Sequence, residues 1–343
     1  MKNYFLCTII LLAGCSNKSS IDKTSSEGNS IHKSSNPGKV HNKLKPNNAL
    51  PKNKNSTLLD NKQNTKTDLE KENKPVLAAP GKKQADSIYS WRNKGTKYIS
   101  LAKTIPTPAG YLRKKVKKQS YAWYLRHLPL KPAGSPVKTY KGKIVSSWQS
   151  FARAVIDLPL DTRGFMQCID VIVKLRAEYL WWRNQKSKIG YLCGTNKYFT
   201  RKQCSKGIRY LKKNNNWQFM KTTSMNSSRH NFNKYLNWIF AMTGTINHVS
   251  EQSISFKNLR AGDFLVTPPP KPGSLGHAIL IVDLASDKKG NLIALFAQGF
   301  TPAQSMHIIK NNHNSWFAIK GSQPVKTPLW KDFHWSDLKR FKY

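Results

Sequence analysis

The clearest alternation of apolar runs and polar breaks lies between Gly262 and Ala303. Apolar runs at 264–266, 278–282 and 292–297 are separated by a Pro-rich loop and by a turn of Asp, Lys and Gly residues. Such runs predict strands, and the last two predict a β-hairpin. A hairpin symmetric about Asp287 and Lys288 places His277 opposite Gln298, with both side chains on one face, unless a bulge breaks the register. Because the strand after His277 is apolar at nearly every position, we expect a central strand covered on both faces.

Spacings of three and four residues predict the main helix. Its apolar stripe comprises Cys168, Val171, Ile172, Leu175, Tyr179 and Trp182, and Asp161 or Thr162 is expected to cap it. Charged residues such as Asp170 and Glu178 are expected to lie mostly off the stripe. Further helices are predicted at 120–128 and 232–242, strands at 152–158 and 305–309, and a loop at 191–199. Helices and strands in this order indicate an α+β fold.

The first 86 residues have the pattern of a targeting segment followed by a tether. Residues 1–14 have a positive start and a short apolar core, far below the ~20 residues that span a bilayer, and are expected to be a signal peptide. Small residues before Cys15 resemble a bacterial lipoprotein cleavage site, which implies lipidation of Cys15; the alternative is an ordinary signal peptide with a chance cysteine. Residues 15–86 are rich in Ser, Asn, Lys and Pro and predict a disordered tether. Residues 87–343 are expected to form a single globular domain.

The charge is strongly positive. The chain has 58 Lys and Arg against 17 Asp and Glu, a net charge of +41. Such an excess favours anionic lipid or an anionic envelope polymer as a neighbour, although a Lys-rich proteome without a specific partner explains it equally well. We expect a protein of the bacterial cell envelope, anchored by lipid and facing the periplasm or the exterior. We expect no nucleic acid partner there, and the oligomeric state is left open.

Five cysteines are present, and export would leave three of them in the folded domain. Cys193 and Cys204 flank a short polar segment and are disulfide candidates in an oxidising compartment. Cys168 would then be the free thiol. No Cys or His spacing typical of a metal site is present, and no cofactor is expected.

The candidate chemistry combines a cysteine with a histidine. A helix N-terminus presents free N–H groups and a positive dipole end, which stabilise a thiolate at Cys168. An imidazole at His277 can act as base, and a polar neighbour such as Gln298 can fix its tautomer. The alternatives are a buried structural cysteine and a satisfied core histidine. We expect neither His230 nor His307 to be catalytic, and Gln167 is a further candidate for stabilising an oxyanion.

This order of residues resembles the papain-like superfamily in its compact bacterial forms, the cell-wall amidases and endopeptidases. The resemblance implies a papain-like core in which a helix carrying Cys168 packs on an antiparallel sheet carrying His277. It also implies that Cys168 is the nucleophile, His277 the general base and acid, and Gln298 the orienting residue. The longer motif that often surrounds the cysteine in such modules is missing here.

A second resemblance covers about 105–330, to the bacterial family called domain of unknown function 4846. It is carried by segments 123–130, 167–170, 175–180, 276–283, 297–298 and 302–305. That family implies an exported location and no activity. The leading expectation is a cysteine amidase or peptidase acting on peptidoglycan or another envelope amide. The alternative is a non-catalytic envelope-binding lipoprotein that uses its basic surface.

Overall fold

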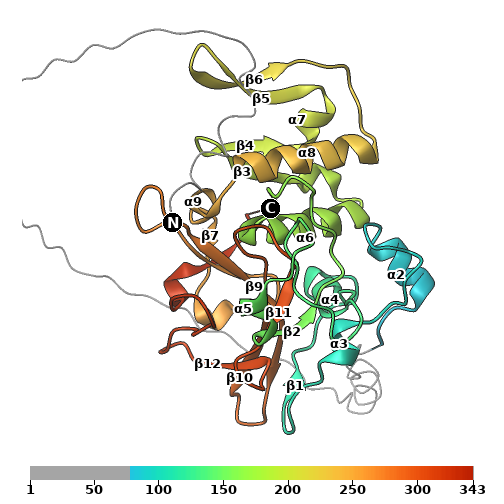
Figure 1. Cartoon of the computed structure of the whole chain (residues 1–343), viewed down its shortest axis with the longest axis vertical. Helices are drawn as coiled ribbons and strands as arrows, with labels where there is room; N and C mark the ends of the chain where they lie inside the picture. The colour runs from blue at the N-terminus through green and yellow to red at the C-terminus, as the bar shows by residue number, and fades with distance from the viewer. Residues whose placement is uncertain (1–77, 343) are drawn as a thin grey trace, which may run out of the picture. The chain divides into compact units, whose positions relative to one another are not determined.

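The computed structural model describes residues 78–342 (Figure 1). The predicted signal peptide, Cys15 and most of the predicted tether lie outside these residues. The predicted end of the tether at residue 86 is wrong, because α2 (Lys82–Ile88) already belongs to the folded part of the chain. Ala85 in this helix is fully buried, and Asp86 forms an ion pair with Arg92. Among the described residues, no helix is both long and apolar enough to cross a membrane.

The fold is a mixed α+β structure built on a nine-stranded sheet in which every pair of strands is antiparallel. The path of the sheet is β2-β11-β10-β9-β8-β13-β7, with β1 added to β9 and β12 added to β10. These strands are β1 (Leu112–Arg113), β2 (Ala152–Val155), β7 (Gln252–Ser253), β8 (Phe264–Thr267), β9 (His277–Ser286), β10 (Leu292–Gln298), β11 (His307–Ile309), β12 (Trp316–Ile319) and β13 (Leu338–Arg340).

Strand β9 is central, as the apolar run predicted. It pairs with β8 on one side and β10 on the other, and all but its last residue are buried. Ala278 and Leu280 belong to the core beneath the helices, whereas Ile279 and Ile281 belong to a second core on the other face. The C-terminal segment, including Phe333, covers that second face.

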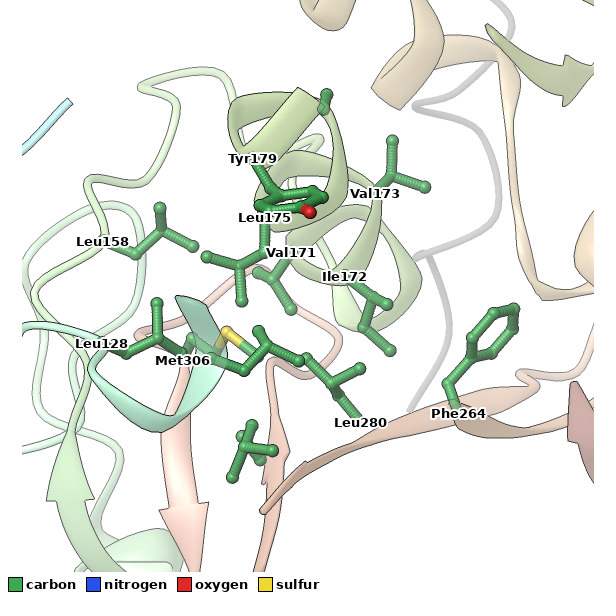
Figure 2. Packing of buried hydrophobic residues seen from close by; sticks show 14 of the residues in the cluster. Leu128, Leu158, Val171, Ile172, Val173, Leu175, Tyr179, Phe264, Leu280 and Met306 are labelled. Carbon is green, nitrogen blue, oxygen red and sulfur yellow. The ribbon is translucent and has the colours of Figure 1, made fainter. Parts of the chain in front are cut away.

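The main helix α6 (Cys168–Trp182) packs on the first face of the sheet. Figure 2 shows Val171 and Leu175 of this helix directed toward a layer that includes Met306 and Leu280. Its predicted cap is wrong, since Gln167 is the N-cap and Asp161 instead accepts hydrogen bonds from the backbone N–H groups of Arg163 and Met166. The helix therefore starts at Cys168 itself.

Asp170 and Glu178 were expected to lie mostly off the apolar stripe of α6. Both are buried, because neighbouring elements cover α6 on more than its sheet face. Glu178 accepts ion pairs from Lys174 and Arg229, each at 2.7 Å, which supplies the positive charge that a buried carboxylate needs.

The remaining helices surround this core. They are α3 (Leu101–Thr104), α4 (Tyr121–Arg126), α5 (Ser146–Gln149), α7 (Arg201–Ser205), α8 (Arg229–Met242) and α9 (Thr245–His248). The helices predicted at 120–128 and 232–242 are confirmed as α4 and α8, and the Ser120 hydroxyl caps α4 by accepting from the N–H of Trp123. The predicted loop at 191–199 is a hairpin of β3 (Gly190–Cys193) and β4 (Lys197–Thr200). A second hairpin, β5 (Ile208–Lys213) and β6 (Asn216–Lys221), lies beside α7 (Figure 1).

The register of the β9–β10 hairpin differs from the symmetric prediction. Asp287 accepts hydrogen bonds from the N–H groups of Lys289 and Asn291, so the turn is longer than two residues and Ser286 faces Leu292. A bulge between Leu295 and Phe296 shifts the pairing once more, and Ala297 then faces Leu280. His277 and Gln298 are therefore not directly opposite. Their offset is an even number of residues, so both side chains still lie on one face.

Candidate functional site

The site is built around the hydrogen bond between His277 and Gln298. The His277 Nε2 and Gln298 Oε1 atoms are 2.8 Å apart, and both side chains are about 99% buried. The Gln298 Nε2 lies 3.2 Å from His307 Nε2, and His307 Nδ1 lies 3.0 Å from the Ser305 carbonyl oxygen. Two histidines are thus joined by one carboxamide.

These contacts fix the proton on each ring. A carboxamide oxygen only accepts, so His277 donates from Nε2, and a carbonyl oxygen only accepts, so His307 donates from Nδ1. The Gln298 N–H then donates to the unprotonated Nε2 of His307. In neutral His277 the lone pair is left on Nδ1, which has no hydrogen-bond partner in the described part of the chain.

Aromatic rings surround the imidazole of His277. Phe300 and Trp330 each lie 4.8 Å from it between ring centroids, and Phe333 lies 6.0 Å away. Burial lowers the pKa of His277 to about 4, since its effect exceeds that of the hydrogen bond that the ring donates to Gln298, which raises the pKa. Burial likewise lowers the pKa of His307 to about 4. Both rings are therefore neutral at neutral pH.

Cys168 is the first residue of α6 and is 96% buried. Burial, with a smaller contribution from the nearby Asp170 carboxyl, raises the pKa of its thiol from 9.0 to about 12. Hydrogen bonding by the backbone N–H groups of Ala278, Ile169 and Cys168 itself acts in the opposite direction and is outweighed. The thiol is therefore protonated at neutral pH, and the predicted low-pKa thiolate is not present in this resting structure.

The helix start and the strand start do come together, as expected. The thiol lies near enough to the backbone of Ala278, the residue directly after His277, for that backbone to lower its pKa. Ala278 lies beyond the last paired position of β10, where Ala297 faces Leu280, so the thiol lies where β9 and β10 separate. Gly299 lines the same gap, because a Cβ atom there would be 3.0 Å from Val171 and 3.1 Å from the Gln167 carbonyl oxygen.

The thiol and the imidazole approach this gap from different sides. The ring of His277 lies among Trp330 and Phe333, which pack with the second core, whereas the side chains of α6 lie in the first core. The expected direct contact between the Cys168 thiol and the His277 ring is not among the interactions of the described residues. The backbone of His277 and Ala278 lies between the two groups, with the ring on His277 and the thiol beside Ala278.

Gln167 lies at this end of the helix but holds a structural role. Its side-chain Oε1 accepts a hydrogen bond from the Thr301 hydroxyl at 2.9 Å, and its backbone N–H donates to Asp170 at 3.0 Å. These bonds join the start of α6 to the segment that follows β10. The predicted oxyanion role of Gln167 therefore requires that its side-chain NH2 group, rather than Oε1, face a substrate.

The predicted disulfide is absent, since Cys168, Cys193 and Cys204 are all free and buried. Cys193 ends β3 and its thiol lies 3.5 Å from the Lys197 carbonyl oxygen. The Cys204 sulfur in α7 instead accepts from Arg209 Nη1 at 3.3 Å. The hairpin and helix between them turn the two thiols to separate partners.

His307 joins the hydrogen-bond network of the site, which the sequence did not predict. It faces Gln298 directly in the β10–β11 pair, although it was not expected to take part in the site. Gln298 and His307 flank a Pro-containing turn, and each lies at the end of an apolar run. This pattern could have predicted that the two side chains meet. Among residues 78–342, no group of three or more His, Cys, Asp or Glu side chains is placed to hold a metal ion.

Comparison with known proteins gives a family but no activity. Residues 101–340 match the family model described as Domain of unknown function (4846). The chain belongs to this family. No curated protein and no solved structure matches the chain. The papain-like core and the lipid anchor at Cys15 therefore remain predictions for this member of the family.

Proposed function

We propose that this family member is an exported cysteine hydrolase that cleaves an amide bond of peptidoglycan or of another envelope polymer. The observation that carries the proposal is the orientation of His277. Gln298 occupies Nε2 and leaves the Nδ1 lone pair available, and the Cys168 thiol lies near the backbone of the next residue, Ala278. Because the ring and the thiol lie against different faces of the sheet, the mechanism requires His277 to turn toward Cys168 when substrate binds. A base whose other nitrogen is held by a carboxamide is the arrangement that a thiol nucleophile requires.

The chemistry proceeds by proton transfer coupled to attack. The thiol proton of Cys168 passes to Nδ1 of His277 while the sulfur bonds to the amide carbonyl carbon. The resulting oxyanion is stabilised by backbone N–H groups at the start of α6. When the C–N bond breaks, the amine takes the proton from the imidazolium and a thioester remains. His277 then takes a proton from water, which hydrolyses the thioester and restores the thiol.

Neutral side chains suit this general-base route better than a preformed ion pair. An imidazole must be neutral to accept a proton, and the lowered pKa of His277 keeps it so at neutral pH. The raised pKa of Cys168 means that few thiolates exist before substrate binds. We therefore expect slow alkylation of Cys168 by iodoacetamide at neutral pH in the folded protein, with a rate that increases up to about pH 12.

Hydrolysis of purified peptidoglycan tests the proposal. Soluble fragments are quantified by mass spectrometry after incubation with the folded protein, and Cys168→Ala is expected to lower the rate about 10³-fold or more. Gln298→Ala is expected to lower the rate less, because it releases the ring without removing the base. Cys193→Ala is the matched control, since Cys193 is an equally buried free cysteine on β3. Equal rates for Cys168→Ala and the unaltered protein would rule out this mechanism.

A second candidate function is binding of an anionic envelope polymer without catalysis. It is favoured by a cluster of cations around Trp181, where Lys186 lies 4.5 Å, Arg201 5.1 Å and Arg229 5.4 Å from the indole ring. With a net charge of +41, we expect affinity for an anionic polymer to fall steeply with added salt. Salt-independent binding would remove this candidate, and peptidoglycan binding by Cys168→Ala without any hydrolysis by the unaltered protein would favour it.

A further inference from the structure

A separate pocket of about 410 Å³ lies where the start of α4, the second half of α6 and the segments around β8 and β13 meet. Its lining includes five cationic residues and a single carboxylate, that of Asp263. The cations are Lys115, Lys117, Arg176, Arg260 and Arg340. Such an excess of positive charge in a concave site attracts an anion.

The only carboxylate of the lining is already neutralised. Arg340 donates from Nε to one oxygen of Asp263 at 2.6 Å and from Nη2 to the other at 2.8 Å. The backbone N–H of Arg260 also donates to Asp263 at 2.9 Å. Because Arg340 already pairs with both oxygens of Asp263, this carboxylate does not neutralise the other cations of the lining.

Arg260 has a guanidinium without a hydrogen-bond or ion-pair partner in the described part of the chain. Partial burial lowers its pKa most, repulsion from Arg340 and more weakly from Arg176 lowers it further, and Asp263 acts in the opposite direction. Neighbouring guanidiniums that repel one another are stabilised by a shared anion.

Tyr121 supplies a second unused donor. Its hydroxyl is buried and has no hydrogen-bond partner among residues 78–342. Its ring is held in place by Gly262, where an added Cβ would lie 2.6 Å from the ring, and by Arg176, whose guanidinium carbon lies 5.2 Å from the ring centroid. A buried hydroxyl without an acceptor costs free energy that a bound oxygen ligand would recover.

We propose that this pocket binds a phosphoryl group, with the guanidinium of Arg260 and the hydroxyl of Tyr121 donating to its oxygens. The donors are planar or directional and match a compact oxyanion better than a diffuse charge. The group is either a free phosphate compound or the headgroup of an anionic lipid. The proposal does not depend on the thiol chemistry, because neither Cys168 nor His277 lines this pocket.

Calorimetric titration of the folded protein with inorganic pyrophosphate, at constant ionic strength, tests the proposal. We expect saturable binding of one ligand per chain. Arg260→Gln is expected to weaken binding roughly 10- to 100-fold, the effect of losing a hydrogen bond between charged groups. Tyr121→Phe is expected to weaken binding about fivefold without lowering the melting temperature, since no described residue bonds to the hydroxyl.

Arg201→Gln is the matched control, because Arg201 belongs to the cation cluster around Trp181 and does not line the pocket. Cosedimentation with phosphatidylcholine vesicles that contain or lack phosphatidic acid distinguishes the two sources of the phosphoryl group. Binding of either probe that depends on Arg260 but not on Arg201 supports the proposal. Absence of binding to both probes, or equal losses in Arg260→Gln and Arg201→Gln, would overturn it. Arg260→Gln is expected to hydrolyse peptidoglycan at an unchanged rate. The test of this pocket and the test of the thiol mechanism can therefore fail separately.

Discussion

Replacing Asp283 by Asn should destabilise the fold more than any surface substitution. Asp283 lies in β9 and is fully buried. Its carboxylate accepts from Arg126 Nε at 3.0 Å and from Arg126 Nη2 at 2.8 Å, and it also accepts from Arg113 Nη1. Arg126 comes from α4 and Arg113 from β1, so one carboxylate holds two further elements on the central strand.

The magnitude follows from what the substitution leaves behind. The side chains of Arg113 and Arg126 are only 5% and 2% exposed, so both charges would stay buried without a counter-ion. Removing one partner of a buried ion pair costs about 3–5 kcal/mol. Since whole domains are stable by roughly 5–15 kcal/mol, the Asp283→Asn variant should be close to unfolding. The melting temperature should fall by about 6–20 °C at this domain size.

Urea unfolding followed by circular dichroism measures the effect, with Asp332→Asn as the control. Asp332 has no ion pair in the described part of the chain, and its substitution should change the free energy of unfolding by less than about 0.5 kcal/mol. An Asp283→Asn variant within about 1 kcal/mol of the unaltered protein would refute the reasoning. The pairing of Asp283 would then not be what holds α4 and β1 on the sheet.

Two further predictions concern the candidate site. Burial lowers the pKa values of His277 and His307 to about 4, against 6.5 unfolded, so the unfolded chain binds protons first as pH falls. The free energy of unfolding should therefore be highest above pH 6.5 and fall toward pH 4, by up to roughly 3 kcal/mol for each histidine. Urea unfolding across this pH range measures the change, and a free energy of unfolding that does not vary with pH would contradict it. Gly299→Ala should cost about 1–3 kcal/mol, because the added Cβ meets the start of α6, whereas Gly81→Ala, with open space around it, should cost far less in the same assay.

The sequence predicted the elements with long apolar periods and missed those fixed by contacts between distant residues. The run of β9 and the stripe of α6 gave a central strand and a helix lying on it, and both are confirmed. The cap of α6 was misplaced because Asp161 competes for the preceding loop, where it accepts from Met166. The hairpin at 190–200 was missed because its strands are short and mixed in polarity.

The candidate site was predictable in part for a similar reason. Side-chain alternation predicted that His277 and Gln298 share one face, and their 2.8 Å hydrogen bond agrees with this. They share it because the bulge after Leu295 restores the parity that the longer turn had changed. The register itself was wrong, because Asp287 lengthens the turn and a bulge follows at Leu295. The role of His307 depends on how β11 pairs with β10, which local patterns do not specify.

Burial, more than residue identity, determines what the proposed thiol chemistry requires. Raising the pKa of Cys168 from 9.0 to about 12 disfavours the thiolate by roughly 4 kcal/mol, even with the N–H groups at the start of α6 acting in the opposite direction. Substrate must therefore compensate this cost at the moment of attack, by placing an oxygen on those N–H groups and by bringing Nδ1 of His277 to the thiol. A mutation that loosens the aromatic cover of His277, such as Trp330→Ala, should raise the pKa of the ring toward 6.5, because water then reaches it. Nuclear magnetic resonance titration of the ring measures this change, and an unchanged pKa would show that Trp330 is not what keeps the base neutral.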